Sequence, residues 1–510
     1  MAIETTTPVP HRTLITICAM VATLMQALDS TIANVALPYM QGSLSASYDQ
    51  ITWVLTSYIT AAAIMTAPVG WLASRFGLKR LFLVSLAGFT ITSMLCGIAG
   101  SLSEMVLFRI LQGMFGAALV PLSQTTMLNL YSAEQRGTAM AVWGMGVMVG
   151  PILGPTLGGY LTELYNWRWV FFVNLPFGLG SIAGLALFLP RTEPREGLRF
   201  DWFGFGALSM GLAGLQLALD RGETLDWFGS TEVITEAVLA GLGFYLFVVH
   251  MCTGKRPLIA PAVFKDRNLS VGLVVMFSVG MVLLAVSALL APWLQELGNY
   301  PVATAGLVMA PRGIGTMAAM LMAGRLVNKV DPRILMAMGI LVLAWSLYQM
   351  TGWTPAVSVT QMIVNTMIQG AGLGFVFIPL QVIAFATLGP ALRTEGTALI
   401  NLTRNIGSAV GISVTEALLT RNGQIEHSVL AGSATGLNRA FAASPAAEAL
   451  LPTTAHGAQM LNLLVNNQSQ IIAYGDDFML MMLTSLPMLL LLPLMRWKRT
   501  PAAVPVAAME

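Results

Sequence analysis

The sequence has little charge and little cysteine. Charged residues make up 10% of its 510 positions, whereas soluble globular domains average about 25%. Its three cysteines, Cys18, Cys96 and Cys252, lie far apart and lack the spacing of a metal site or a disulfide framework. Phosphate-cradling motifs and nucleophile elbows are missing as well. These absences argue against an enzyme and a nucleic-acid-binding protein, and we expect no bound metal or cofactor.

Long apolar stretches dominate the rest of the chain. Hydrophobic residues make up 56% of the sequence. Runs of about 20 residues, enough to cross a bilayer, recur from Leu14 to Met495 with only short polar breaks. The polar first thirteen residues and the long run after them indicate an uncleaved signal anchor. The pattern predicts an all-α, polytopic membrane protein with fourteen transmembrane helices, at 14–38, 51–73, 81–100, 104–128, 138–161, 168–189, 202–220, 232–251, 269–294, 304–327, 334–351, 357–387, 396–419 and 476–495.

The positions of lysine and arginine predict the orientation. With the N-terminus in the cytoplasm, 19 of the 26 basic residues fall in inner segments and four in outer segments. The other three, Arg109, Arg312 and Arg404, lie within predicted helices. An inner excess of this size favours this orientation and an even number of helices. We therefore expect both termini in the cytoplasm.

An internal repeat divides the chain into halves. VGWLASRFGLKRL at 69–81 resembles AGRLVNKVDPRIL at 323–335, and QGMFGAALVPL from Gln112 resembles QGAGLGFVFIPL from Gln369. Such near-constant separations predict a duplicated six-helix unit in parallel orientation. We expect two six-helix bundles that face each other across a midplane cavity, with two helices inserted between them. The predicted units are 1–200, 201–255 and 256–510, and the last contains an outer loop at about 421–475.

Several stretches resemble signatures of the major facilitator superfamily. They are the loop GWLASRFGLKR at 70–80, RILQG at 109–113 in the fourth helix and GPILGPTLGG at 150–159 in the fifth. With LDSTIANVALP at 28–38 and WRWVFFVNLPFG at 167–178, they make the whole chain similar to the Emr-type multidrug exporters. Those exporters belong to the fourteen-helix drug:proton antiporter branch of the superfamily.

The resemblance implies a transporter that works by alternating access. It would use the proton gradient to export varied amphipathic or apolar toxic compounds across the bacterial inner membrane. Two alternatives remain open. One is a dedicated exporter of a single natural molecule, such as a fatty acid, lipid or siderophore, and the other is a non-transporting membrane receptor or assembly subunit.

Two of these signatures have expected mechanical roles. The superfamily commonly has an acidic residue where Ser74 stands, which puts a carboxylate-to-arginine latch at the cytoplasmic gate in doubt. The basic residues there can still engage helix C-terminal dipoles or lipid headgroups. The spaced glycines of the fifth helix predict a close contact with a helix of the opposite half, with ordinary close packing as the alternative. The gate residues are Gly70, Arg75, Gly77, Lys79 and Arg80, and the fifth-helix residues are Gly150, Pro151, Gly154, Pro155, Gly158 and Gly159.

Asp29 is the candidate proton carrier. No histidine lies deep in a predicted helix, and nearly all other carboxylates fall in loops or at helix ends. An intramembrane carboxylate is costly and is functional by default. Arg109 is the nearest plausible cation, and separation of this pair would make proton occupancy depend on conformation. The alternative is a structural pair that only fixes helix packing.

Other polar residues form a second tier. We expect Glu416 near the outer boundary and Arg312 and Arg404 in structural roles, with their long side chains reaching toward a surface. Amides on the candidate cavity helices can give a few directional contacts to a substrate. These amides are Gln26, Asn34, Gln112, Asn365, Gln369, Gln381 and Asn401.

The polar segment at 421–475 is the longest outer one. Within it, residues 455–472 have apolar positions at helical spacing, which is typical of an amphipathic helix. The Emr-type resemblance implies a docking surface for a periplasmic adaptor that continues to an outer-membrane channel. The alternative is a solvated cap that packs on its own helices.

Overall fold

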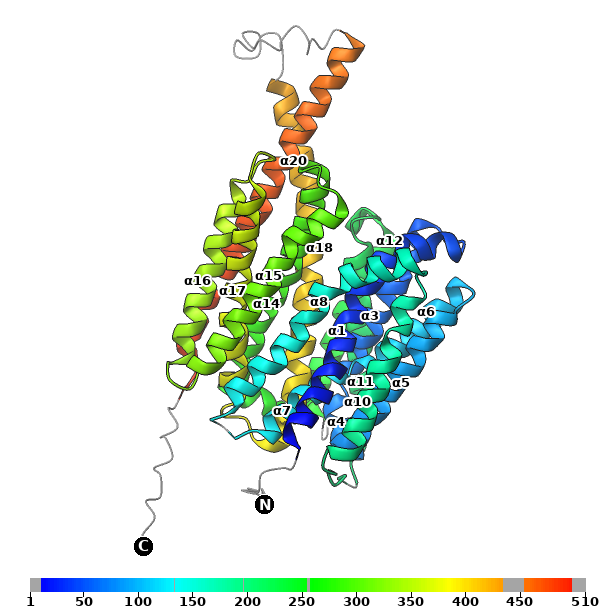
Figure 1. The fold of residues 1–510 in the computed structure, drawn as a ribbon, viewed down its shortest axis with the longest axis vertical. Helices are drawn as coiled ribbons and strands as arrows, with labels where there is room; N and C mark the ends of the chain where they lie inside the picture. Colours follow the sequence, from blue (N-terminus) through cyan, green and yellow to red (C-terminus); the bar gives the residue numbers. More distant parts are fainter. Residues whose placement is uncertain (1–10, 133, 196, 255–256, 434–453, 498–510) are drawn as a thin grey trace.

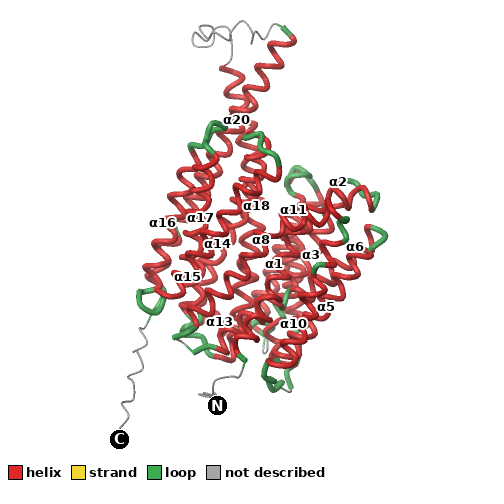
Figure 2. The backbone as a smooth tube through the Cα atoms, in the orientation of Figure 1, coloured by secondary structure: helices red, strands yellow, loops and turns green. Residues whose placement is uncertain are grey.

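The computed structural model describes residues 11–497 except 133, 196, 255–256 and 434–453. In this part of the chain all regular secondary structure is helical, which confirms the predicted all-α fold. Long helices stand side by side, and one helical hairpin projects beyond them (Figure 1). The tube in Figure 2 shows turns and loops joining the described helices at their ends. We call the end that carries the hairpin the outer end, and the end where α1 starts the inner end.

The N-terminal half packs around its first helix. That helix, α1, contacts both α8 and α10, and α5 packs between α6 and α10. The helices of this half are α1 (Arg12–Ser43), α2 (Tyr48–Ile51), α3 (Trp53–Thr66), α4 (Val69–Phe76), α5 (Leu78–Ile98), α6 (Leu102–Gly116), α7 (Leu119–Leu130), α8 (Arg136–Leu164), α9 (Trp169–Phe172) and α10 (Asn174–Phe188).

Two inserted helices follow, and then the C-terminal half. The inserted helices pack against each other, and the first of them also touches α3 and α18. They are α11 (Trp202–Arg221) and α12 (Thr231–Thr253), with the short 3-10 helix η1 (Trp227–Gly229) between them. The C-terminal half comprises α13 (Pro261–Lys265), α14 (Arg267–Pro292), η2 (Trp293–Leu297), α15 (Val302–Leu326), α16 (Pro332–Thr351), α17 (Val359–Ala384), η3 (Pro390–Leu392), α18 (Arg393–Ser433), α20 (Ala455–Ser485), α21 (Met488–Leu491) and η4 (Leu492–Leu494).

The protein is a multi-span membrane protein. Among the described residues, eleven helices are long and apolar enough to cross a bilayer, and the bent pair α3 and α4 raises the number to twelve. Two more predicted spans correspond to α8 and α18, which have 29 and 41 residues but are not among these twelve. The count of fourteen therefore stays a prediction.

Proline and glycine shape the turn between α3 and α5. Pro68 begins α4, whose axis is bent by 57° from that of α3. Because proline has no N–H, the helix hydrogen bonding is interrupted there. Gly77 then turns the chain with φ +85°, and a Cβ at this position would lie 2.6 Å from the carbonyl oxygen of Thr192. Only glycine fits this turn without strain.

The projecting hairpin is formed by α18 and α20. The first continues as one helix from the inner end to Ser433, and the second begins at Ala455. His427 Nε2 and Asn462 Oδ1 lie 3.0 Å apart across the hairpin. The predicted amphipathic helix over 455–472 is thus the start of α20. The segment predicted as a loop at 421–475 is helical at both ends, and its middle lies outside the described residues.

Candidate functional site

Asp29 lies at the centre of a buried polar cluster in the N-terminal half. Its carboxylate is 0% exposed and forms an ion pair with Arg109, with 2.7 Å between Oδ2 and Nη1. Its other oxygen accepts hydrogen bonds from Gln112 Nε2 at 2.9 Å and from Asn174 Nδ2 at 3.3 Å. Three helices, α1, α6 and α10, therefore meet at one carboxylate. The sequence pointed to Asp29 and Arg109 as partners, and the structure brings them together.

Arg109 is held by more than its ion pair. Its Nε donates to the carbonyl oxygen of Val54 at 3.0 Å, and Nη1 also donates to Gln112 Oε1 at 2.9 Å. The Tyr58 ring lies 4.0 Å from the guanidinium carbon, which is a cation–π contact. Nη2 is buried and has no hydrogen-bond partner among the described residues.

This geometry couples protonation to movement. With Arg109 in contact, the ionised carboxylate of Asp29 is compensated. If Asp29 gained a proton in place, Arg109 would become a buried charge without a counter-charge, which costs about 3–5 kcal/mol. The cluster can thus take up a proton only if the guanidinium moves or finds another partner.

Four of the predicted cavity amides serve other contacts. Gln112 belongs to the Asp29 cluster described above. Gln26 Nε2 donates to the Tyr58 hydroxyl at 3.4 Å. Asn365 Nδ2 donates to the Ser346 carbonyl at 3.2 Å, and Gln369 Nε2 lies 3.5 Å from the Met350 sulfur. The last two therefore face α16, not the N-terminal half, and the side chain of Asn34 lies outside the described residues.

Gln381 and Asn401 join the two halves. Both contact Gln124 of α7: its Nε2 donates to Gln381 Oε1, and its Oε1 accepts from Asn401 Nδ2 at 3.0 Å. Next to Gln124 in sequence, the Thr125 hydroxyl lies 2.9 Å from the hydroxyl of Thr397, which precedes Asn401 by one helical turn. All five side chains are buried. These amides and hydroxyls, which we call the inner link, correct the prediction that Gln381 and Asn401 are open to a substrate.

The halves meet at their inner ends. Beyond the inner link, Asn328 Nδ2 donates to the Glu134 carbonyl and Arg393 Nη1 donates to Asn129 Oδ1. Gly137 of α8 packs on Val327 after α15. Toward the outer end, the Ser413 hydroxyl of the C-terminal half donates to the carbonyl of Leu219 in α11. The structure is therefore closed at the inner end.

The loop between α4 and α5 makes only part of the predicted gate contacts. Lys79 Nζ donates to the carbonyls of Ala186 and Leu189 at 2.8 and 2.6 Å, so it binds the C-terminus of α10 as expected. Neither Arg75 nor Arg80 forms an ion pair among the described residues. Gly70 packs directly on the opposite half, because a Cβ there would lie 3.0 Å from Glu395 Cα.

Glu395 is a candidate site residue that the sequence analysis did not assign. It lies in the first turn of α18, before the predicted span 396–419, and accepts a hydrogen bond from the Ala260 amide. Burial raises the pKa of its carboxyl to about 7, although this hydrogen bond acts in the opposite direction. A half-buried carboxyl at the contact of two halves can respond to the pH at the inner end.

The fifth-helix glycines have a different partner from the predicted one. A Cβ at Gly150 would lie 2.8 Å from the α1 backbone at Leu28, and one at Gly154 would clash with the Thr31 side chain. Gly158 meets Ile32 in the same way, whereas Gly159 has nothing within 4 Å. The stripe thus packs on α1 of its own half, next to Asp29. The side chains of Pro151 and Pro155 lie outside the described residues.

The second-tier arginines do not reach a surface. Arg312 is 9% exposed, and it donates to Ser287 Oγ at 2.6 Å and to the Leu283 carbonyl at 2.9 Å. Arg404, half-buried, donates only to Asn405 Oδ1 at 3.5 Å and forms no ion pair with any described residue. Glu416 is exposed on the outer part of α18.

Comparisons with known proteins agree with this architecture. The sequence model of the Major Facilitator Superfamily matches residues 19–412. The chain belongs to this superfamily. It is 36% identical over 471 residues to the multidrug export protein EmrB of Escherichia coli strain K12, with 91% of each chain covered. It is 34% identical over 476 residues to the fatty acid resistance protein FarB of Neisseria gonorrhoeae, covering 91% of this chain and 92% of that one.

A solved structure shows the same superfamily fold. The human organic anion transporter MFSD10 superposes with a TM-score of 0.61 at 14% sequence identity, covering 93% of this chain and 100% of the other. Membership of the superfamily makes this protein a transporter.

Proposed function

We propose that this protein is a proton-coupled antiporter that exports varied amphipathic or apolar compounds across a bacterial inner membrane. The observation that carries the proposal is the fully buried Asp29, bound at once by Arg109, Gln112 and Asn174. The relatives named as multidrug export proteins support the range of compounds.

The cluster suggests the order of events. In the present arrangement the inner end is closed and Asp29 is paired with Arg109. A proton from the outer side would neutralise Asp29 and release the guanidinium, which would then favour a different arrangement of α1 and α6. When Asp29 and Arg109 pair again, Asp29 would lose its proton toward the inner side. The energy source is the proton gradient, and no cofactor is required.

The hairpin of α18 and α20 suits a protein partner. It projects at the outer end (Figure 1) and exposes large apolar side chains. Val429 is 55% and Leu463 is 57% exposed. We include in the proposal a periplasmic adaptor that would bind here and lead to an outer-membrane channel. Deletion of residues 430–465 should abolish capture of the adaptor, and unchanged capture would rule out docking on the hairpin.

A specific observation favours a second candidate, a dedicated exporter of an anionic amphiphile such as a fatty acid. Arg404 lies roughly 16 Å along α18 from its start, near the middle of the membrane, where an unpaired guanidinium is rare. A carboxylate substrate could pair with it there. The relative named for fatty acid resistance is consistent with this candidate.

Transport assays in proteoliposomes test both candidates. Ethidium and dodecanoate, an amphipathic cation and an amphipathic anion, serve as probes under an imposed pH gradient. The leading proposal predicts that both are moved, and that Asp29→Asn abolishes both while binding remains measurable. Glu163→Gln, which removes an exposed carboxylate, is the control and should transport normally. Movement of dodecanoate alone would favour the dedicated exporter, and normal transport by Asp29→Asn would refute the assigned proton carrier.

A further inference from the structure

A second buried carboxylate lies in the C-terminal half. Asp477 of α20 is 1% exposed, and neither of its oxygens accepts a hydrogen bond from a described residue. The buried side chains of Phe478 and Met481 follow it on the helix. Asp29 is equally buried but accepts hydrogen bonds from three side chains. The two carboxylates therefore differ in whether the protein stabilises their ionised form.

Among the described residues, no cation pairs with Asp477. Its helix packs against α14, α16, α18 and η2, and none of the ion pairs recorded among the described residues includes it. An ionised carboxylate left without a partner in such a site costs several kcal/mol more than the protonated acid. The titratable groups on the outer parts of these elements and on α20 itself are Asp476, Tyr474, His456, Glu296, Tyr348, Glu416, Arg421, Glu426 and His427.

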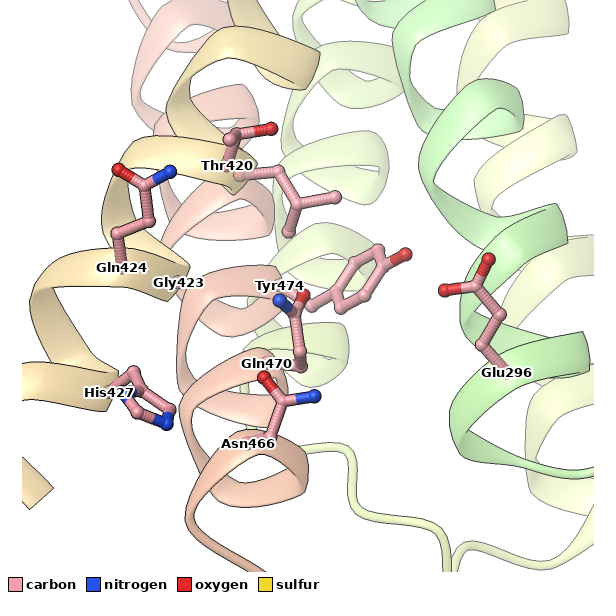
Figure 3. Close-up of a pocket in the computed structure, with 9 residues that line it drawn as sticks. Glu296, Thr420, Gly423, Gln424, His427, Asn466, Gln470 and Tyr474 are labelled. Carbon is pink, nitrogen blue, oxygen red and sulfur yellow. The ribbon is translucent and has the colours of Figure 1, made fainter. Parts of the chain in front are cut away.

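A polar pocket connects this region to the outer end. It is a cavity of about 630 Å³ at the base of the hairpin, and its lining includes Glu296, His427, Gln470 and Tyr474. In Figure 3 the Tyr474 hydroxyl points across the pocket toward the Glu296 carboxylate. Tyr474 interacts electrostatically with both Glu296 and Asp477. It precedes Asp477 by one helical turn. Through Tyr474 the pocket therefore comes within one helical turn of Asp477 along α20.

A Leu-Pro pair after each segment aligns Asp477 in sequence with a residue of the Asp29 cluster. Both α10 and the α20–α21 segment lead into a Leu-Pro pair, Leu189-Pro190 and Leu492-Pro493. Counted back from these prolines, Asn174 and Asp477 occupy the same position. Asn174 donates to Asp29, so the C-terminal half carries a carboxyl where the N-terminal half carries the amide that binds one.

We propose that Asp477 is a second proton-binding site of the transport cycle, filled from the outer side through the pocket at Glu296 and Tyr474. In the present arrangement the carboxyl holds its proton, while Asp29 is ionised against Arg109. The step is a simple proton transfer from outer water to a carboxylate oxygen. Its role in transport rests on the proposed antiport, whereas its protonation does not.

Infrared spectroscopy of the purified full-length protein tests the protonation directly. At pH 7 the wild type should show the C=O stretch of a protonated carboxylic acid with few hydrogen bonds. Asp477→Asn should lose this band, and the matched control Asp476→Asn, which changes an exposed neighbour, should keep it. A band that survives Asp477→Asn would overturn the proposal.

A variant that keeps the carboxyl tests the path and does not depend on the stability of Asp477→Asn. In Tyr474→Phe the band should remain, but its hydrogen–deuterium exchange should slow by about tenfold, because a hydroxyl that lines the pocket one helical turn from Asp477 is lost. Exchange as fast as in the wild type would contradict the path through the pocket.

Accumulation measurements test the coupling. With the membrane potential clamped at zero, the logarithm of the ethidium or dodecanoate ratio is plotted against the imposed pH difference, using whichever probe the wild type moves faster. The slope should be about two in the wild type and about one in Asp477→Asn. Equal slopes in both proteins would overturn the second site, whereas a wild-type slope of zero would instead refute the proposed antiport.

Discussion

The two halves of the protein share a repeat but treat buried charge differently. In the N-terminal half Asp29 and Arg109 are in contact and both are fully buried. In the C-terminal half Arg312 binds only a hydroxyl and a carbonyl, and Asp477 has no partner among the described residues. The duplicated backbone therefore fixes where helices pack, whereas individual side chains decide which half holds a buried ion pair.

The largest effect is expected when the paired arginine is compared with the unpaired one. Arg109→Gln leaves Asp29 without its cation and should reduce pH-driven efflux by about 100-fold or more, because a broken buried pair costs about 3–5 kcal/mol. Arg312→Gln removes two hydrogen bonds and should mainly lower the melting temperature, through a loss of about 1–3 kcal/mol. Efflux in proteoliposomes and thermal unfolding measure the two effects. If the two variants lost efflux equally and neither lost stability, the proposed difference between the halves would be wrong.

The next effect concerns the glycine stripe that holds α8 against α1. Gly150→Ala would place a Cβ 2.8 Å from the α1 backbone, and we expect a destabilisation of about 1–3 kcal/mol from overpacking. Gly159→Ala has nothing within 4 Å and should be neutral or slightly stabilising, since alanine favours helix. Thermal unfolding in detergent compares them. If both variants melted alike, the close contact beside Asp29 would not hold.

A smaller effect is expected at the inner link. Gln124→Ala leaves Gln381 and Asn401 without their shared partner and should destabilise the closed inner end by about 1–3 kcal/mol. Spin labels at the exposed positions Ser132 and Lys329, in a background without native cysteines, report the distance between the inner ends. A distribution shifted toward longer distances is the expected result. Unchanged distances would show that the other inner contacts alone keep the end closed.

The smallest effect is a pH dependence of the distance between the labels at the inner ends. The pKa of Glu395 is raised to about 7 by burial, so the closed contact favours the neutral carboxyl. Closure should therefore be strongest at acidic pH and should weaken as the pH rises through about 7. Glu395→Gln, which stays neutral, should remove the dependence. A pH response that persists in this variant would assign it to another group.

The sequence located the buried ion pair but not its surroundings. A charge inside an apolar run is visible without coordinates, which is why Asp29 and Arg109 were found. Asn174 stood in a quoted motif, yet its contact with Asp29 depends on how α10 is rotated, and no residue pattern states that. Gln381 and Asn401 were assigned to a cavity because they are amides on candidate cavity helices. The sequence does not show whether such an amide faces a substrate or, as here, another side chain.

Other differences come from tertiary packing. The glycine stripe was assigned to the opposite half because a smooth face suits any neighbouring helix, and only the structure shows that α1 occupies it. Asp477 was overlooked because Asp476-Asp477 stood at the start of a predicted span, where charge is ordinary. In the structure α20 begins at Ala455, and the helices packed around it bury the second of the two carboxylates.

The most direct test of the account is a count of protons released by the purified protein when a transported probe is added in weak buffer near pH 7. We predict a release that is present in the wild type and in Glu163→Gln and absent in Asp29→Asn, because the probe should favour the arrangement in which Asp29 loses its proton and pairs with Arg109. An equal release from Asp29→Asn, or none from a wild type that binds the probe, would contradict the central claim.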